Sequence, residues 1–206
     1  MALLVGTTLL AAAAGPAHSA PTLLYVRADA GGSFPTGNDL NGFDASPLFG
    51  VGVGFSPLPF LRTDVTLSYR SDYSGSATET VLPGVTASAK SDIKSLVGMV
   101  NAYYDFPTII NVKPYIGGGV GLARNELGDT TVTAGGMTAT IGGSTKTQFA
   151  WQLGGGVAFS VAPAIAIDIA YHYLDAGKFE TASFAGTTAS GRLKAHEVTA
   201  GIRVGF

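Results

Sequence analysis

The sequence predicts an all-β fold: an eight-stranded antiparallel transmembrane up-and-down β-barrel preceded by a signal peptide. Three observations predict this fold. Apolar residues alternate with polar residues or glycine in eight segments, the connections between these segments alternate between long and short, and the chain opens with an apolar leader. Successive strand residues point to opposite faces, so a period of two gives each segment one apolar face. We assign residues 1–19 to the signal peptide and residues 20–206 to the barrel domain.

The leader has the pattern of an export signal. Residues 3–14 are an apolar run of Ala, Leu and Val that only Gly and Thr interrupt, and Ala17 and Ser19 are the small residues that signal peptidase requires. A membrane helix is the alternative, but the uninterrupted apolar part is shorter than the ~20 residues of a span, and Gly15-Pro16 breaks it. An exported chain without a spanning helix can enter a membrane as a closed β-barrel, which pairs every backbone group between strands.

The composition excludes several classes of protein. Charged residues make up 13% of the chain, about half of the ~25% usual in soluble proteins, whereas 29 of the 206 residues are glycine. Low charge with 46% apolar residues argues against intrinsic disorder. The net charge of −2 predicts no nucleic-acid partner. The absence of cysteine excludes disulfides and thiolate metal sites.

The alternation is clearest where Val65, Leu67 and Tyr69 share one face and Arg62 and Asp64 share the other. The eight segments with this pattern lie near residues 24–29, 49–55, 60–70, 92–105, 115–122, 148–159, 165–173 and 197–206. The register of residues 92–105 is ambiguous, and a β-bulge there is one explanation. Each segment is about as long as the ~9–11 residues that cross a bilayer at a tilt.

The connections determine which kind of barrel is predicted. They are long, short, long, short, long, short and long, at residues 31–47, 56–59, 71–91, 105–112, 123–146, 161–163 and 175–191. Outer-membrane barrels have short periplasmic turns and longer extracellular loops, and an even number of strands brings both termini to one side. A soluble lipocalin-like barrel is the alternative, but it would place the apolar face inside and has no reason to segregate its loop lengths. We expect the four long connections to be mobile loops.

In this arrangement the charged face lines the lumen. Lumen-facing glycines leave room for a polar network there, because an eight-stranded barrel is barely wide enough for side chains. The predicted network consists of Arg27, Asp29, Arg62, Asp64, Arg70, Asp168, His172, Glu197 and Arg203. Charges removed from water need partners, so we expect this balanced set to form salt-bridged plugs. Aromatic residues near the ends of the outward faces fit interfacial girdles.

Several segments carry a resemblance to a known family. Residues 114–121 (PYIGGGVG) and 149–156 (FAWQLGGG) resemble the fifth and sixth strands of the opacity-protein-like family of small Gram-negative outer-membrane β-barrel proteins, often described as porins. Residues 101–106 (NAYYDF) and 171–175 (YHYLD) resemble its fourth and seventh strands. The resemblance implies a protein of the cell outer membrane, in contact with its lipid and lipopolysaccharide. Members include adhesins, structural surface proteins and immune-facing antigens.

The last strand is similar to the closing strand that the barrel-assembly machinery recognises in this family. The resemblance therefore implies that Phe206 is an assembly signal and that the assembly machinery is a partner. The physical reason is that the last strand must pair with the first, because an open edge in lipid leaves backbone groups unsatisfied.

We expect no catalytic, cofactor-binding or metal-binding residues. The glycine clusters lack the G-x-G-x-x-G spacing, and the three histidines are far apart in sequence. Barrel-shaped lipid A deacylases carry a His-x-Ser pair, but here His172 is followed by Tyr173 and Leu174, and an aliphatic side chain cannot form an acyl intermediate. We therefore expect a non-enzyme with a structural, surface-recognition or adhesin-like role, binding host or surface ligands through its long loops. A barrel lipid hydrolase and a narrow small-solute channel remain the alternatives.

Overall fold

The computed structural model describes residues 24–37, 44–82, 85–134, 137–180 and 190–206, and the predicted signal peptide, residues 1–19, lies outside these ranges. The strands are β1 (Leu24–Thr36), β2 (Ser46–Leu58), β3 (Leu61–Leu82), β4 (Val85–Asp105), β5 (Val112–Leu127), β6 (Thr130–Ala134), β7 (Met137–Ile141), β8 (Ser144–Ala162), β9 (Ile165–Glu180) and β10 (Ser190–Gly205). Within the described ranges, we find no helix that is long and apolar enough to cross a membrane.

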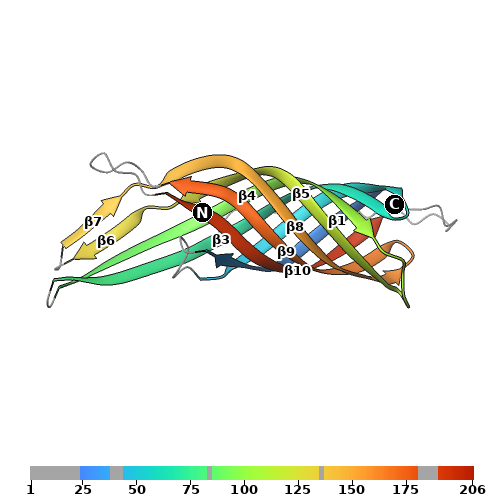
Figure 1. Cartoon of the computed structure of the whole chain (residues 1–206), viewed down its shortest axis with the longest axis horizontal. Helices are drawn as coiled ribbons and strands as arrows, with labels where there is room; N and C mark the ends of the chain where they lie inside the picture. The colour runs from blue at the N-terminus through green and yellow to red at the C-terminus, as the bar shows by residue number, and fades with distance from the viewer. Residues whose placement is uncertain (1–23, 38–43, 83–84, 135–136, 181–189) are drawn as a thin grey trace, which may run out of the picture.

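Eight of these strands close into a barrel (Figure 1). Neighbouring strands are antiparallel, and the ring runs through β1, β2, β3, β4, β5, β8, β9 and β10. The last strand pairs with the first from Tyr25↔Gly205 to Thr36↔Lys194, so the ring has no open edge between them. The predicted all-β, eight-stranded antiparallel barrel is confirmed.

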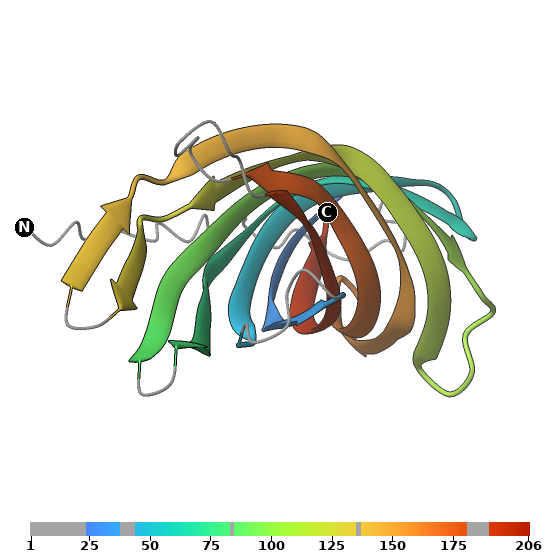
Figure 2. The same ribbon diagram turned by 60° about the vertical axis from the view of Figure 1, so that its left-hand side comes forward.

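The barrel has two different ends, which we name by their connections. The turn end carries the short connections 59–60, 106–111 and 163–164 together with Leu24 and Phe206, where the Phe206 N–H donates to the Leu24 carbonyl over 3.0 Å. We name the opposite end the ribbon end. There β3 and β4 continue far past the neighbouring strands, and β6 and β7 form a separate hairpin attached to β4 (Figures 1 and 2).

The prediction that residues 71–91 form a loop is wrong. Most of this segment is β-structure, since β3 and β4 are 22 and 21 residues long and pair from Ser76↔Lys90 to Leu82↔Val85. Its Thr, Val and Tyr residues favour strands. The sequence criterion missed this because it required an apolar face, which a two-stranded ribbon outside the bilayer does not need. For the same reason, the expected loop at 123–146 contains β6, β7 and the ends of β5 and β8.

The ambiguous register of residues 92–105 is settled in the structure. On β4 the odd-numbered side chains from Ile93 to Asp105 are buried inside, and β4 pairs with β5 without interruption from Ile93↔Leu127 to Asp105↔Tyr115. The register shift lies on the partner strand β3, between Arg70 and Tyr73. Asn101, Tyr103 and Asp105 therefore face the lumen.

The outward face forms an apolar band between two levels of aromatic side chains. Val51, Val65 and Val120 lie exposed in this band, each with more than half of its surface accessible. On β8, Phe149 and Phe159 mark its two edges; ten residues at a rise of ~3.3 Å and a tilt of ~40° span about 25 Å. That height matches the apolar band of transmembrane barrels.

The outward band predicts how charge is tolerated along β3. Val65→Arg should lower the free energy of unfolding by about 2–4 kcal/mol, because it places a guanidinium near the bilayer midplane. Ser74→Arg is the matched control, since Ser74 is exposed on the same strand beyond the register shift, outside the band. Denaturant titration of both variants in lipid vesicles measures the two costs. Equal costs at the two positions would contradict the assigned membrane band.

Candidate functional site

The interior of the barrel is the candidate site, because all nine of the predicted network residues point into it. The structure distributes them over three levels along the barrel axis. Arg62, Asp168 and Arg203 lie toward the turn end, Arg27, Asp29 and Asp64 lie in the centre, and Arg70 and Glu197 lie toward the ribbon end. His172 is paired with Glu197 in the register of β9 and β10.

Asp64 organises the central level. Its Oδ2 accepts hydrogen bonds from the Tyr25 hydroxyl and from Arg27 Nη1, both over 3.1 Å. Its Oδ1 accepts from Asn101 Nδ2 over 2.7 Å and from the Tyr103 hydroxyl over 3.3 Å. The carboxylate thus receives four donors from β1 and β4, which compensates for its removal from water.

The central level extends from Asp64 to the neighbouring strands. Arg27 binds Asp29 through a two-pronged interaction, Nη2 to Oδ1 over 2.8 Å and Nε to Oδ2 over 2.9 Å. Gln152 Nε2 donates to Asn101 Oδ1 over 2.7 Å, which connects β8 to β4. Strands β1, β3, β4 and β8 are therefore joined across the lumen by side chains as well as along their edges by backbone.

Glycine makes this packing possible at specific positions. A β-carbon at Gly119 would overlap Asn101 Oδ1, and one at Gly201 would overlap Asp29 Oδ1. Neither glycine has the positive φ that favours glycine for backbone reasons. Space for the neighbouring polar side chain is what requires glycine at both positions.

Arg70 and Glu197 form the most buried ion pair. Arg70 Nε and Nη2 contact the two oxygens of Glu197 over 2.6 and 2.9 Å, and each side chain is 2% exposed. Ser33 donates to Glu197 Oε1 over 2.7 Å, and the Tyr73 hydroxyl lies 2.6 Å from the Ser33 hydroxyl. A two-pronged pair with further hydrogen bonds is the geometry in which a buried ion pair offsets its desolvation.

An apolar cluster fills the barrel beyond this pair, toward the ribbon end. Its buried members are Tyr73, Ile93, Val97, Met99, Ala123, Leu127, Ala150, Leu174, Ala176 and Leu193. They come from β3, β4, β5, β8, β9 and β10. The lumen is thus packed with side chains from its centre to this end, as in the core of a water-soluble protein.

The turn end is less filled. Arg62 Nε lies 2.8 Å from both oxygens of Asp105, and its guanidinium lies 4.8 and 4.7 Å from the ring centres of Tyr103 and Tyr115. Arg203 lies 3.4 Å from Asp168 and over the ring of Tyr25.

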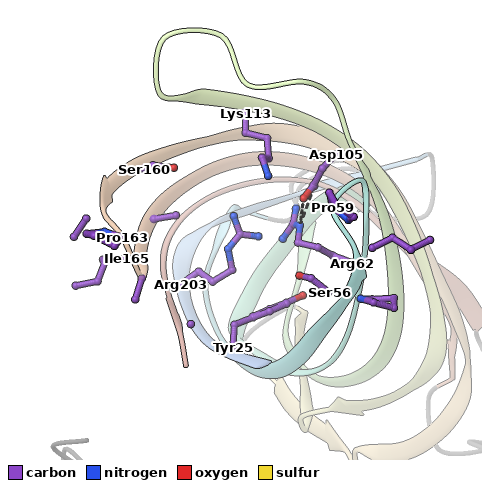
Figure 3. Close-up of a pocket in the computed structure, with 16 residues that line it drawn as sticks. Tyr25, Ser56, Pro59, Arg62, Asp105, Lys113, Ser160, Pro163, Ile165 and Arg203 are labelled. Carbon is purple, nitrogen blue, oxygen red and sulfur yellow. Dashed lines mark hydrogen bonds and ion pairs between the residues drawn. The ribbon is translucent and has the colours of Figure 1, made fainter. Parts of the chain in front are cut away.

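Four of these residues, Tyr25, Arg62, Asp105 and Arg203, border a cavity of about 400 Å³ that opens at this end (Figure 3). It is about ten times larger than the space of about 40 Å³ near His172.

The geometry does not bring His172 and Asp168 together as a catalytic pair. They stand four residues apart on the inner face of β9, roughly 13 Å at ~3.3 Å per residue. His172 instead borders a small space of about 40 Å³ beside Arg27 and Glu197. Among the residues that the structure describes, no three His, Asp or Glu side chains gather where they could hold a metal ion.

The lumen contains further polar groups that were not predicted from the sequence. They include Tyr25, Ser33, Tyr73, Asn101, Tyr103, Asp105, Tyr115, Asn125 and Gln152. Tyr25 and Tyr115 were missed because the predicted network was restricted to charged residues and histidine, and the β4 residues were missed because the register was ambiguous. The period-two spacing of Asn101, Tyr103 and Asp105 was the signal that could have found them.

Comparisons with known proteins agree with this architecture. A family profile described as outer membrane protein beta-barrel domain matches residues 2–206. The outer membrane protein PagN of Salmonella typhimurium is 33% identical over 138 residues, covering 63% of this chain and 57% of PagN. A candidate adhesin of Rickettsia conorii is 30% identical over 74% of this chain and 65% of its own length. The chain thus spans less than two-thirds of these two relatives. A candidate adhesin of Rickettsia prowazekii is 26% identical over 97% of this chain and 95% of its own length.

Solved structures support the fold. The crystal structure of Neisserial surface protein A has a TM-score of 0.61 and 24% identity, covering 89% of this chain and 97% of that protein. At this identity, the similarity indicates the same barrel architecture. Because the family match extends over nearly the whole chain, the chain belongs to the outer membrane protein β-barrel domain family, and it is located in the outer membrane.

Proposed function

We propose that this chain is a non-enzymatic surface-recognition protein: the ribbon end binds a host or surface ligand, and the plugged barrel anchors it in the membrane. The turn end is periplasmic and the ribbon end extracellular, following the loop lengths of outer-membrane barrels. The observation that carries the proposal is the length of β3 and β4 beyond the membrane band.

Tyr69 is the last outward aromatic residue of β3, and residues 70–82 follow it. At ~3.3 Å per residue, these thirteen residues can reach about 40 Å along the strand. Pairing with β4, with register shifts between Arg70 and Tyr73 and between Thr80 and Leu82, makes this extension a two-stranded ribbon, and β6 adds to it through residues 87–90 (Figure 2). A projecting sheet is suited to presenting a binding surface away from the membrane. The Rickettsia relatives described as candidate adhesins support the same role.

The interior supports a non-conducting, non-hydrolytic barrel. The buried Arg70–Glu197 pair and the apolar cluster occupy the lumen where a solute would have to pass. Leu174, at the position of the hydrolase serine, is fully buried in that apolar cluster. These observations favour surface recognition over the channel and the lipid hydrolase.

Removing the ribbon should abolish binding and leave folding intact. Replacing residues 77–89 by Asn-Gly keeps the native pair Ser76↔Lys90 beside a two-residue hairpin turn. A non-adherent Gram-negative strain displaying the wild-type chain should be retained on cultured epithelial cells several-fold above the empty-vector strain. The trimmed variant should return retention to the vector level, while its heat-modifiable gel migration stays normal.

The control variant is Pro83→Asn, which introduces the same Asn-Gly turn and keeps the full ribbon. It should adhere as the wild type does. Full adhesion by the trimmed variant, or wild-type retention no higher than the vector strain, would contradict the proposed role of the ribbon.

We further propose that Phe206 acts as an assembly signal. Its side chain is 65% exposed on the outer face of the turn end, and its backbone closes the ring against β1. Phe206→Ala should therefore reduce the yield of inserted barrel in pulse-labelled cells, measured as heat-modifiable migration, and leave protease-sensitive periplasmic material.

Phe60→Ala is the matched control, because Phe60 is a comparably exposed aromatic residue at the same end of the barrel. It should insert normally. Equal insertion of the two variants would mean that Phe206 is only an interfacial anchor.

A further inference from the structure

The cavity at the turn end is bordered by three cationic side chains from three different strands. Arg62 comes from β3, Lys113 from β5 and Arg203 from β10. In Figure 3 the ends of these side chains point toward one central space. Asp105 is the one acidic residue that borders the cavity. Asp168 does not border it but lies 3.4 Å from Arg203. With both carboxylates counted, positive charge is in excess.

Two of these cations have hydrogen-bonding groups to spare. Arg62 binds Asp105 through its Nε atom. Its Nη2 atom is buried without a hydrogen-bond partner, and the residue is only 5% exposed. Arg203 Nη1 is also buried without a partner, as is Asp168 Oδ1, which lies 3.4 Å from Arg203 Nη2. A buried donor that is left unpaired costs free energy, and charge-assisted contacts between a guanidinium and an anion are strong.

The two guanidinium groups are held in place before any ligand arrives. Arg62 lies against the rings of both Tyr103 and Tyr115, and Arg203 lies 5.5 Å from the ring centre of Tyr25. Fixing the donors in advance lowers the entropic cost of binding. The rim adds apolar contacts from Leu58, Pro163 and Ile165 among others, and about 400 Å³ suits a small organic group.

From these observations we propose that the turn-end cavity is a binding site for a phosphate group, entered from the periplasm. Three donors that converge from three strands match a tetrahedral oxyanion better than a planar carboxylate, which a single guanidinium fork already satisfies. The phosphate belongs either to a soluble periplasmic phosphate ester or to a phospholipid headgroup of the inner leaflet. This site is independent of the proposed surface role, since it lies at the opposite end of the barrel.

Nuclear magnetic resonance of arginine-labelled, full-length protein in phosphate-free detergent micelles tests the site. Inorganic phosphate and glycerophosphorylethanolamine are titrated separately at constant ionic strength, with chloride as the reference anion. The side-chain N–H signals of Arg62 and Arg203 should shift saturably, whereas those of Arg27 and Arg70 should stay unchanged. Tighter binding of inorganic phosphate assigns the site to soluble phosphates, and tighter binding of the phosphodiester assigns it to lipid headgroups.

Lys113→Gln should weaken phosphate binding about tenfold, because it removes one charge-assisted contact from a half-buried residue at the mouth. Lys178→Gln removes the same charge from an exposed position at the ribbon end and should leave binding unchanged. The proposal is overturned if neither phosphate compound gives saturable shifts, if chloride reproduces them, or if the two lysine variants bind phosphate equally well.

Discussion

The closed ring of backbone hydrogen bonds is the constraint from which the rest of this structure follows. In lipid, every strand edge must be paired, and here closure between β1 and β10 leaves eight strands around the lumen. A ring of that size encloses only enough space for side chains. Charged residues on the inner face are therefore separated from bulk water and need partners within the barrel. The four hydrogen bonds to Asp64 and the ion pair of Arg70 with Glu197 supply those partners.

The same constraint makes the two ends of the molecule structurally different. Between the aromatic levels, the chain must present an apolar surface outward and pair its polar groups inward. Beyond the ribbon-end level neither requirement holds, so β3 and β4 continue as a ribbon of Ser, Thr and Ala whose sequence is free to serve recognition. At the turn end, the packing of the lumen stops short and leaves cationic groups around a cavity. The packed centre of the lumen lies between these two ends and separates them.

Much of this could be predicted from sequence because a two-faced strand in lipid has a strict pattern. The alternation of Val65, Leu67 and Tyr69 with Arg62 and Asp64 predicts both the strand and which of its faces points into the lumen. What could not be predicted depends on neighbours that sequence does not display. Whether Tyr103 or Tyr104 faces the lumen depends on the register of β4, and in the observed register the Tyr103 hydroxyl donates to Asp64. The partner of Arg70 is Glu197, 127 residues away, which no local spacing indicates. The ribbon was missed because its pairing continues after its apolar face ends.

The central claim is that the lumen charges form a paired plug that holds the barrel together. A double-mutant cycle on Arg70 and Glu197, read as free energies of unfolding in lipid vesicles, tests it most directly. Arg70→Met and Glu197→Gln should each cost about 3–5 kcal/mol, because each leaves an uncompensated buried group, and the double variant should cost much less than their sum. Lys178→Gln, which removes a charge from an exposed position at the ribbon end, should cost about 0–0.5 kcal/mol. Additive single costs, or costs as small as at Lys178, would contradict the claim.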